Sequence, residues 1–291
     1  SARLFAAVLS LRGARARAFE AGDLGLVTNA DHGRAEPCPD SEAAMRAAME
    51  DLEGDVIPVV TGFIGRTRGG VITTLGRGGS DFSAALFGAA AGAEEIQIWT
   101  DVPGFLQADP AIIPGASVIP AMRFEEAAEL AYFGARVLHP RTIEPAQRRG
   151  IPVRVLGTFD VDPAGAVPVD QQGTLISRDA PLVPIRALAM QAEVRSLHVH
   201  SLRMLDAPGF LARVFDVFAR HRISIDVVAT SEVSVSMTFD PAGEGLEAAI
   251  EEITGFAEVE ASPPRALLSL VGPGLREDPS LLARVFGVFG A

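Results

Sequence analysis

An internal repeat constrains the fold of this chain more than any other feature of its sequence. The segment LARVFDVFAR at residues 211–220 returns as LARVFGVFGA at residues 282–291. Such self-similarity predicts two copies of one small folding unit. The second copy begins with the apolar segment LLSLVG at 267–272 and includes only its first helix, whose apolar face we expect to be exposed.

The residues around the first copy predict a complete unit of the βαββαβ type. We expect strands at 196–201, 224–230, 233–239 and 257–260, and helices at 211–220 and 246–253. This order of elements is typical of the ferredoxin-like fold. The sequence therefore predicts one such unit at 183–263 and the start of a second at 264–291.

Residues 1–182 alternate helical and strand-like patterns, which favours an α/β domain built on a parallel sheet. Strands are expected at 56–61, 96–100 and 153–156, and helices at 41–52, 80–91, 124–132 and 141–149. The first eleven residues carry apolar side chains at helical spacing, with no initiating Met and no signal-peptide cleavage site. They predict a helix that the sequence enters midway.

Composition narrows the classes of function. With 48% hydrophobic and 21% charged residues and no apolar run near the ~18 residues that cross a bilayer, the chain is expected to be globular and to have no membrane span. A net charge of −12 argues against nucleic acid as a partner. The single cysteine, Cys38, excludes an internal disulfide and fits a reducing cytoplasm.

All 25 basic residues are arginine. P-loop enzymes and protein kinases place a lysine near the nucleotide phosphates, so both mechanisms are excluded for this chain.

The densest motif is TTLGRGGSDFSAAL at residues 73–86. Gly76, Gly78 and Gly79 allow backbone N–H groups to approach an anion, and the helix that follows favours negative charge at its amino end. A tight turn in which Ser80 is only a helix cap is the alternative. Arg77 favours anion binding, because a guanidinium can hold a carboxylate or phosphate through two hydrogen bonds.

A second candidate is IQIWTDVPGFLQADP at residues 96–110. Its strand ends in Thr100 and Asp101, and the carboxyl ends of parallel strands are where open α/β folds bind ligands. An ordinary turn that contains Asp is the alternative.

These motifs, together with GRAEP (33–37), TGFIG (61–65), FGARVLHP (133–140) and TSEVSV (230–235), resemble the aspartate kinase branch of the amino acid kinase family. The resemblance covers nearly the whole chain and is closest to the lysine-sensitive class. It implies an αβα sandwich with a mainly parallel sheet, followed by ferredoxin-like ACT domains. The implied reaction is the ATP- and Mg²⁺-dependent phosphorylation of the side-chain carboxylate of L-aspartate to 4-phospho-L-aspartate, the first step of lysine, threonine and methionine biosynthesis.

The resemblance also implies roles for individual residues. Glu36 would bind the ammonium of aspartate and Arg77 a carboxylate, and the remaining substrate residues would be Phe63, Gly79 and Ser80. The catalytic set would be Arg77, Asp81 and Arg136. Nucleotide contacts would come from Thr100, Asp101, Phe105 and Arg136. No metal ligand is assigned.

The sequence departs from the family pattern in four places. The KFGG motif would lie upstream of residue 1, so we expect this chain to be inactive alone. Arg136 stands where the family has a lysine, Phe105 where tyrosine is common, and Ala111 where an arginine often contacts the nucleotide.

For the repeated unit, the resemblance implies a lysine-binding surface and assembly into a homodimer or a higher oligomer. Its residues would be Met204, Gly209, Leu211, Ser224, Ile225, Asp226, Thr230, Ser231 and Glu232. Asp226 would pair with the ε-ammonium of lysine, and backbone N–H groups near Gly209 would hold its carboxylate. A structural domain that only dimerises is the alternative.

Two other functions remain open from the sequence. One is an amino acid kinase that acts on glutamate, carbamate or a nucleoside monophosphate, and the other is a regulatory subunit without catalysis. His198 and His200 alternate on one strand at a spacing that could bind metal, but without a third ligand nearby they predict a structural role.

Overall fold

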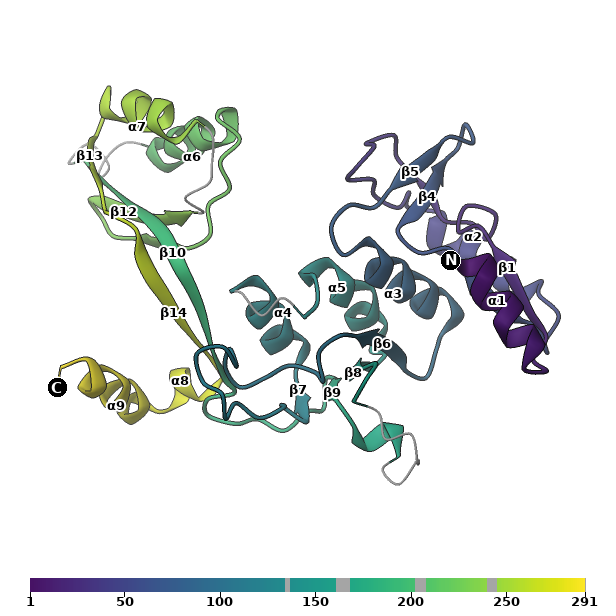
Figure 1. Ribbon diagram of the computed structural model, residues 1–291. Helices are drawn as coiled ribbons and strands as arrows, with labels where there is room; N and C mark the ends of the chain where they lie inside the picture. Colours follow the sequence, from purple (N-terminus) through teal and green to yellow (C-terminus); the bar gives the residue numbers. More distant parts are fainter. Residues whose placement is uncertain (134–136, 161–167, 202–207, 240–244, 291) are drawn as a thin grey trace. The chain divides into compact units, whose positions relative to one another are not determined.

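The computed structural model describes residues 1–133, 137–160, 168–201, 208–239 and 245–290 (Figure 1). The chain divides into two compact units. Unit 1 comprises residues 1–189 and 270–291, and unit 2 comprises residues 190–269. Among the described residues, no helix combines the length and the apolar character needed to span a membrane.

Unit 1 begins with the helix that the first residues predict. Its main helices are α1 (Ala2–Leu11), α2 (Ser41–Glu50), α3 (Gly79–Ala91), α4 (Phe124–Tyr132) and α5 (Pro140–Arg149). All five were predicted, and their boundaries agree within two residues. Helix α3 ends where Gly92 adopts a left-handed conformation, with φ of +63°, which a glycine tolerates without strain.

The strands of unit 1 form three small sheets. In the first, β1 (Ala16–Phe19) pairs in parallel with β3 (Ile57–Val60). The second has the order β2-β4-β5, with β2 at Val27–Thr28, β4 at Ile64–Thr67 and β5 at Ile72–Thr74. The third has the order β6-β8-β9-β7, with β6 at Ile96–Thr100, β8 at Val153–Gly157, β9 at Thr174–Ile176 and β7 at Ala121–Met122.

Parallel pairing dominates these sheets. The parallel pairs are β1–β3, β2–β4, β6–β8 and β7–β9, whereas β4–β5 and β8–β9 are antiparallel. The predicted α/β class with a mainly parallel sheet is therefore confirmed. The sequence did not predict β1, β2, β4, β5, β7 and β9, because strands of two to four residues carry too little alternation to be recognised.

Strand β8 lies between β6 and β9 in the third sheet, and all five of its residues are buried. One of them is Arg154, whose guanidinium binds the carboxylate of Glu95 at 2.9–3.0 Å. A buried charge is tolerated only when it is paired and hydrogen-bonded, and Glu95 satisfies that condition. The apolar neighbours of β8 include Ile98, Phe105 and Ile143, which belong to the largest core cluster of the unit.

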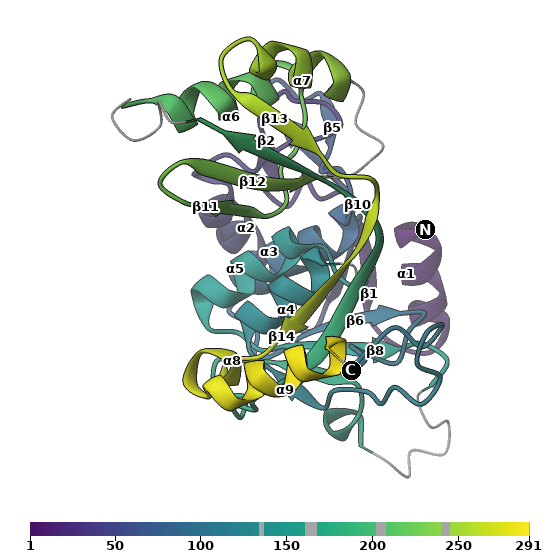
Figure 2. The same ribbon diagram turned by 90° about the vertical axis from the view of Figure 1, so that its left-hand side faces the viewer.

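Unit 2 has the predicted ferredoxin-like topology. Its elements are β10 (Ala187–His200), α6 (Phe210–Arg220), β11 (Val228–Thr230), β12 (Ser234–Phe239), α7 (Leu246–Thr254) and β13 (Glu258–Ala261). The sheet order is β11-β12-β10-β13, and each pairing is antiparallel. Helices α6 and α7 lie on one face of this sheet (Figure 2), and side chains of both helices and of β10 and β12 share one core cluster.

Strand β10 is longer than the predicted strand, because it begins at Ala187, and it also pairs with β14 (Arg265–Val271). Strand β11 is shorter than predicted. The N–H of Asp226 donates to the carbonyl of Thr238, and the N–H of Thr238 donates to the carbonyl of Val227. Asp226 and Val227 are thus both opposite Thr238, an arrangement of two residues against one that is typical of a β-bulge. It interrupts the regular pairing before Val228.

After β14 the chain forms a short helix, α8 (Gly274–Glu277), and then α9 (Pro279–Phe289), the helix that the repeat predicts.

Candidate functional site

The glycine loop between β5 and α3 is the place where the sequence motifs meet. Gly76 and Gly78 have φ of +83° and +68°, a left-handed conformation that favours glycine. A Cβ atom added at Gly76 would lie 2.8 Å from the carbonyl oxygen of Gly33, and one added at Gly78 would lie 2.5 Å from Cβ of His139. The GRAEP and VLHP segments therefore both pack directly on this loop.

The TGFIG segment packs on the next residue of the same loop. A Cβ atom added at Gly79 would lie 2.8 Å from Cδ2 of Phe63. Phe63 itself has φ of +73°, its N–H donates to Oγ of Ser83 at 3.2 Å, and its carbonyl accepts from the N–H of Leu75 at 2.9 Å. A bulky residue held in this strained conformation, with 42% of its surface exposed, is typical of a functional position.

Glu36 is fixed through both its backbone and its side chain. The N–H of Glu36 donates to Oδ1 of Asn29 at 3.1 Å, and its carbonyl accepts from the N–H of Asn29 at 2.9 Å. The Nη2 of Arg141 lies 2.9 Å from Oε1 of Glu36. The side chain of Glu36 is 64% exposed, so it remains open to a ligand.

Positive charge gathers around Gly78. His139 caps α5, where its Nδ1 accepts from the N–H of Arg141 at 3.3 Å. Burial lowers the pKa of His139, and the positive charges of Arg141 and Arg77 lower it further. Gly78, which follows Arg77 in the loop, packs on His139, and the lowered pKa keeps the ring of His139 neutral at neutral pH, with Nδ1 as the accepting nitrogen.

Asp81 lies in the first turn of α3, immediately after the glycine loop, and is half-buried. Burial raises the pKa of its carboxyl group. A partly desolvated acid beside a cationic loop has the features of a functional group. Ser80, which precedes it, is exposed.

The structure therefore brings together Glu36, Phe63, Arg77, Gly79, Ser80 and Asp81 around one loop. Thr100 and Asp101 lie at the carboxyl end of β6. There Oγ1 of Thr100 donates to Oδ1 of Asp101 at 3.1 Å. Among the described residues, no hydrogen bond or ion pair joins these two to the glycine loop.

Phe105 requires a correction, because its side chain is fully buried in the core of unit 1. Its N–H donates to Oγ1 of Thr174 at 2.8 Å, and its carbonyl accepts from the N–H of Ile119 at 2.7 Å. Neither the ring nor the backbone of Phe105 is available to a nucleotide. Arg136 lies outside the described residues.

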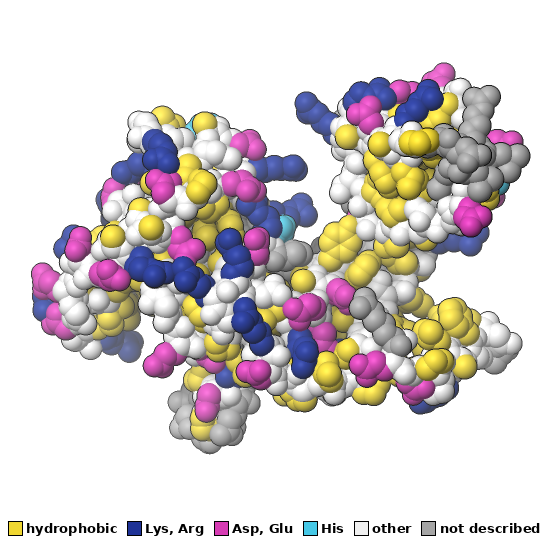
Figure 3. Space-filling model, turned by 180° about the vertical axis from the view of Figure 1, so that it is seen from behind, with side chains coloured by type: hydrophobic (Ala, Val, Ile, Leu, Met, Phe, Trp, Pro, Cys, Tyr) yellow, Lys and Arg dark blue, Asp and Glu magenta, His cyan; other side chains and the backbone are white. Residues whose placement is uncertain are grey.

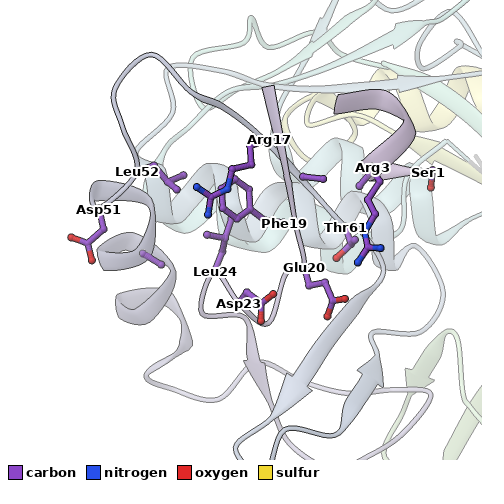
Figure 4. A pocket seen from close by; sticks show the side chains of 13 residues that line it. Ser1, Arg3, Arg17, Phe19, Glu20, Asp23, Leu24, Asp51, Leu52 and Thr61 are labelled. Carbon is purple, nitrogen blue, oxygen red and sulfur yellow. The ribbon is translucent and has the colours of Figure 1, made fainter. Parts of the chain in front are cut away.

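A pocket of about 690 Å³ lies beside α1 and β1 (Figure 4). In this pocket the guanidinium of Arg17 stacks over the ring of Phe19, with Cζ 4.5 Å from the ring centroid. Thr61 is the only lining residue that belongs to a motif singled out above, and none of the predicted site residues lines this pocket.

The predicted effector residues of unit 2 fall in three segments. Gly209 precedes α6 with φ of +91°, and Leu211 and Ile225 both pack against the core cluster of the unit. Thr230 ends β11, and Ser231 and Glu232 lie in the turn before β12, where the N–H of Ser231 donates to the carbonyl of Ser234. Ser224 is exposed, and Met204 lies outside the described residues.

His198 hydrogen-bonds Oγ of Ser236 through Nδ1 at 2.7 Å. In the part of the chain that the structure describes, no three His, Cys, Asp or Glu side chains are grouped so as to hold a metal.

Sequence reasoning missed three residues of the glycine-loop site: Asn29, His139 and Arg141. His139 belongs to the VLHP motif, and a histidine before Pro140 at the start of a helix indicates a cap. The contact of Arg141 with Glu36 spans 105 residues and left no signal in the sequence.

The sequence matches two family profiles. The profile described as amino acid kinase family matches residues 1–157, and that described as ACT domain matches residues 201–258. Chloroplastic aspartokinase 2 of Arabidopsis thaliana is 41% identical, over 99% of this chain and 54% of that protein. An aspartokinase of Thermus thermophilus is 32% identical, over 98% of this chain and 70% of that protein. The chain spans about half the length of the Arabidopsis relative.

Two solved structures of Escherichia coli aspartokinase III are also similar, each at 39% identity. The complex with aspartate and ADP (R-state) has a TM-score of 0.79 and covers 99% of this chain and 64% of that chain. The complex with lysine and aspartate (T-state) has a TM-score of 0.73, and the match covers 93% of this chain and 60% of that chain. The chain therefore belongs to the aspartokinase branch of the amino acid kinase family and carries an ACT domain.

Proposed function

We propose that the glycine-loop site takes part in the transfer of the γ-phosphoryl group of ATP to the side-chain carboxylate of L-aspartate, which gives 4-phospho-L-aspartate. The convergence of Glu36, Phe63 and Arg77 on this loop carries the proposal. It provides an acid, an apolar wall and a cation within one region of unit 1. The similar E. coli enzyme, solved with aspartate and ADP, supports this choice of substrates.

The charges of the site fit an amino acid with a second carboxylate. Glu36 would bind the ammonium, and Arg77 would bind a carboxylate through two hydrogen bonds. Phe63, Gly79 and Ser80 would line the substrate, and His139, whose pKa is lowered, would not repel the ammonium of the substrate.

The nucleophile of this reaction is the substrate's own carboxylate, so the protein contributes position and charge. Arg77 and Arg136 would neutralise the transferred group, with Asp81 beside it, and Thr100 and Asp101 would contact the nucleotide. Magnesium commonly binds through one or two carboxylates together with substrate phosphates. The half-buried Asp81 fits that pattern, and Mg²⁺ would neutralise charge on the phosphates.

The role of Arg77 can be tested in the full-length protein. We expect Arg77→Ala to raise the KM for aspartate about 10- to 100-fold, because hydrogen bonds to a charged group contribute ~1.5–3 kcal/mol. The KM for ATP should change less. Arg68→Ala is the matched control, since Arg68 is an exposed arginine that pairs with Asp40 at 2.7 Å.

A larger effect on the KM for ATP would assign Arg77 to the nucleotide. Turnover of glutamate in place of aspartate, followed as the hydroxamate of the acyl phosphate, would reject the proposed substrate.

We further propose that unit 2 binds lysine as a feedback effector and joins two or more copies of the protein. The solved lysine complex of the E. coli enzyme supports the effector, and the terminal strands β11 and β13 offer sheet edges for assembly. The cytoplasm is the proposed location, because a single cysteine needs no oxidising compartment.

Asp226→Ala tests the effector site. The lysine concentration for half-inhibition should rise at least tenfold through loss of one charge pair, while the uninhibited rate stays the same. Glu251→Ala, an exposed acid on α7, is the control. Unchanged lysine sensitivity in Asp226→Ala would show that Asp226 is not part of the effector site.

A further inference from the structure

Arg141 contacts three parts of the glycine-loop site, two through its side chain and one through its backbone N–H. From α5, its Nη2 reaches Oε1 of Glu36 at 2.9 Å. The same guanidinium lies over the ring of Phe82 in α3, with Cζ 4.9 Å from the ring centroid. Its backbone N–H donates to His139, whose side chain packs on Gly78. Arg141 therefore links the GRAEP segment to both helices that flank the loop.

The contact leaves Glu36 oriented but open. Both backbone groups of Glu36 bond Asn29, and Arg141 holds one carboxylate oxygen, Oε1. The side chain of Glu36 is 64% exposed, whereas that of Arg141 is only 33% exposed. The cation is thus the anchored partner, packed on Phe82, and the carboxylate is the accessible one.

We propose that Arg141 is a positioning residue, which fixes the carboxylate of Glu36 so that its second oxygen accepts the ammonium of the substrate. This inference rests on the proposed function, in which Glu36 binds that ammonium. A flexible glutamate side chain loses rotamer entropy when a ligand orders it, and Arg141 removes that cost before the substrate binds. Arg141 therefore contributes to selection of an amino acid over a plain dicarboxylate.

Helix α5 offers a matched control in Arg149. It also pairs with an acid more than one hundred residues earlier, since its Nε lies 2.9 Å from Oε1 of Glu42 in α2. Both ion pairs tie α5 to another segment of unit 1. Only Glu36 belongs to the proposed substrate site. A comparison of the two arginines therefore separates an effect on the orientation of Glu36 from a general effect of attaching α5 to another segment.

The test compares Arg141→Ala, Arg141→Lys and Arg149→Ala in the full-length protein. We expect Arg141→Ala to raise the KM for aspartate roughly three- to tenfold, because the pair is partly exposed and screened by water. The KM for ATP should stay within about twofold, and Arg149→Ala should leave both constants unchanged. Arg141→Lys keeps the charge but loses the planar stacking, so its KM should be intermediate.

Succinate, used as a competitive inhibitor, supplies the decisive readout. It has both carboxylates of aspartate but no ammonium. If Arg141 acts through Glu36, Arg141→Ala leaves the inhibition constant of succinate within about twofold of wild type. An equal loss of succinate and aspartate binding would show instead that Arg141 contacts a carboxylate directly, and it would overturn the inference.

A double variant tests the coupling. The KM for aspartate of Glu36→Gln with Arg141→Ala should equal that of Glu36→Gln alone, because Arg141 then has no carboxylate to position. Additive effects would overturn the inference, as would an equal effect of Arg149→Ala. A wild-type protein that turns over no aspartate rejects the proposed function itself, whereas an active wild type with an unaffected Arg141→Ala rejects only the positioning role.

Discussion

Helices α6 and α9 have nearly the same sequence and very different surroundings. In α6, Val217 and Phe218 are buried, with 0% and 1% of their surface exposed. The equivalent residues of α9, Val288 and Phe289, are 78% and 69% exposed. The apolar side chains over α9 are visible in the space-filling view (Figure 3).

The difference shows which property of a helix the local sequence determines. Both segments form helices with an apolar face, as the repeat predicts, because that pattern depends only on residue spacing. Burial depends on a sheet that the helix can cover. In unit 2 the sheet of β10 and β12 supplies Leu197, Val235 and Met237 to the core around α6.

A matched pair of side-chain truncations, one in each helix, should give the largest effect and sharpens this comparison most. Phe218→Ala should lower the free energy of unfolding of unit 2 by about 3–5 kcal/mol, because it removes a fully buried ring and leaves a cavity. In the 291-residue chain, Phe289→Ala should change stability by less than about 0.5 kcal/mol, because its ring is 69% exposed. Hydrogen exchange measured peptide by peptide follows each unit separately.

The control for this pair is Phe286→Ala, a second exposed ring on α9. We attribute the burial of α6 to the sheet that it covers, because the sequence of the two helices is nearly the same. A loss of unfolding free energy above about 2 kcal/mol for Phe289→Ala, or no loss for Phe218→Ala, would contradict this explanation.

The same contrast between local pattern and distant contact explains what the sequence predicted of the site. The glycine loop was predictable, because Gly76 and Gly78 are needed wherever backbone segments approach closely or φ is positive. Its neighbours Glu36, Phe63 and Arg77 were assigned through the resemblance, and the structure places them around that loop. Their roles stay predictions until substrate binding is measured.

Two features of the site could not be predicted from the local sequence. The resemblance assigned Phe105 to the nucleotide, yet its ring is fully buried in the largest core cluster of unit 1. Arg141 is one of 25 arginines, and only the folded chain shows which acid it meets. A contact between distant segments has no periodicity of its own, so pattern reasoning cannot find it.

The starts of the two helices give the smallest effect. Helix α6 follows Gly209, which has no capping side chain, whereas Asp278 caps α9 by accepting from the N–H of Ser280 at 2.9 Å. Hydrogen bonds from Ser280 lower the pKa of Asp278. A carboxyl group with a lowered pKa stabilises the fold above its usual pKa of about 4, and this contribution is lost as the pH falls through the lowered value.

We therefore expect Asp278→Ala to speed amide exchange in the first turn of α9 at neutral pH and to leave α6 unchanged. Asp278→Asn should retain most of the protection, since asparagine also caps helices, and it should remove the dependence on pH below about 4. Equal exchange in wild type and Asp278→Ala would show that Pro279, at the first position of α9, is sufficient to start the helix without a capping side chain. The two copies of the repeat would then begin by backbone geometry alone, and only the sheet would distinguish them.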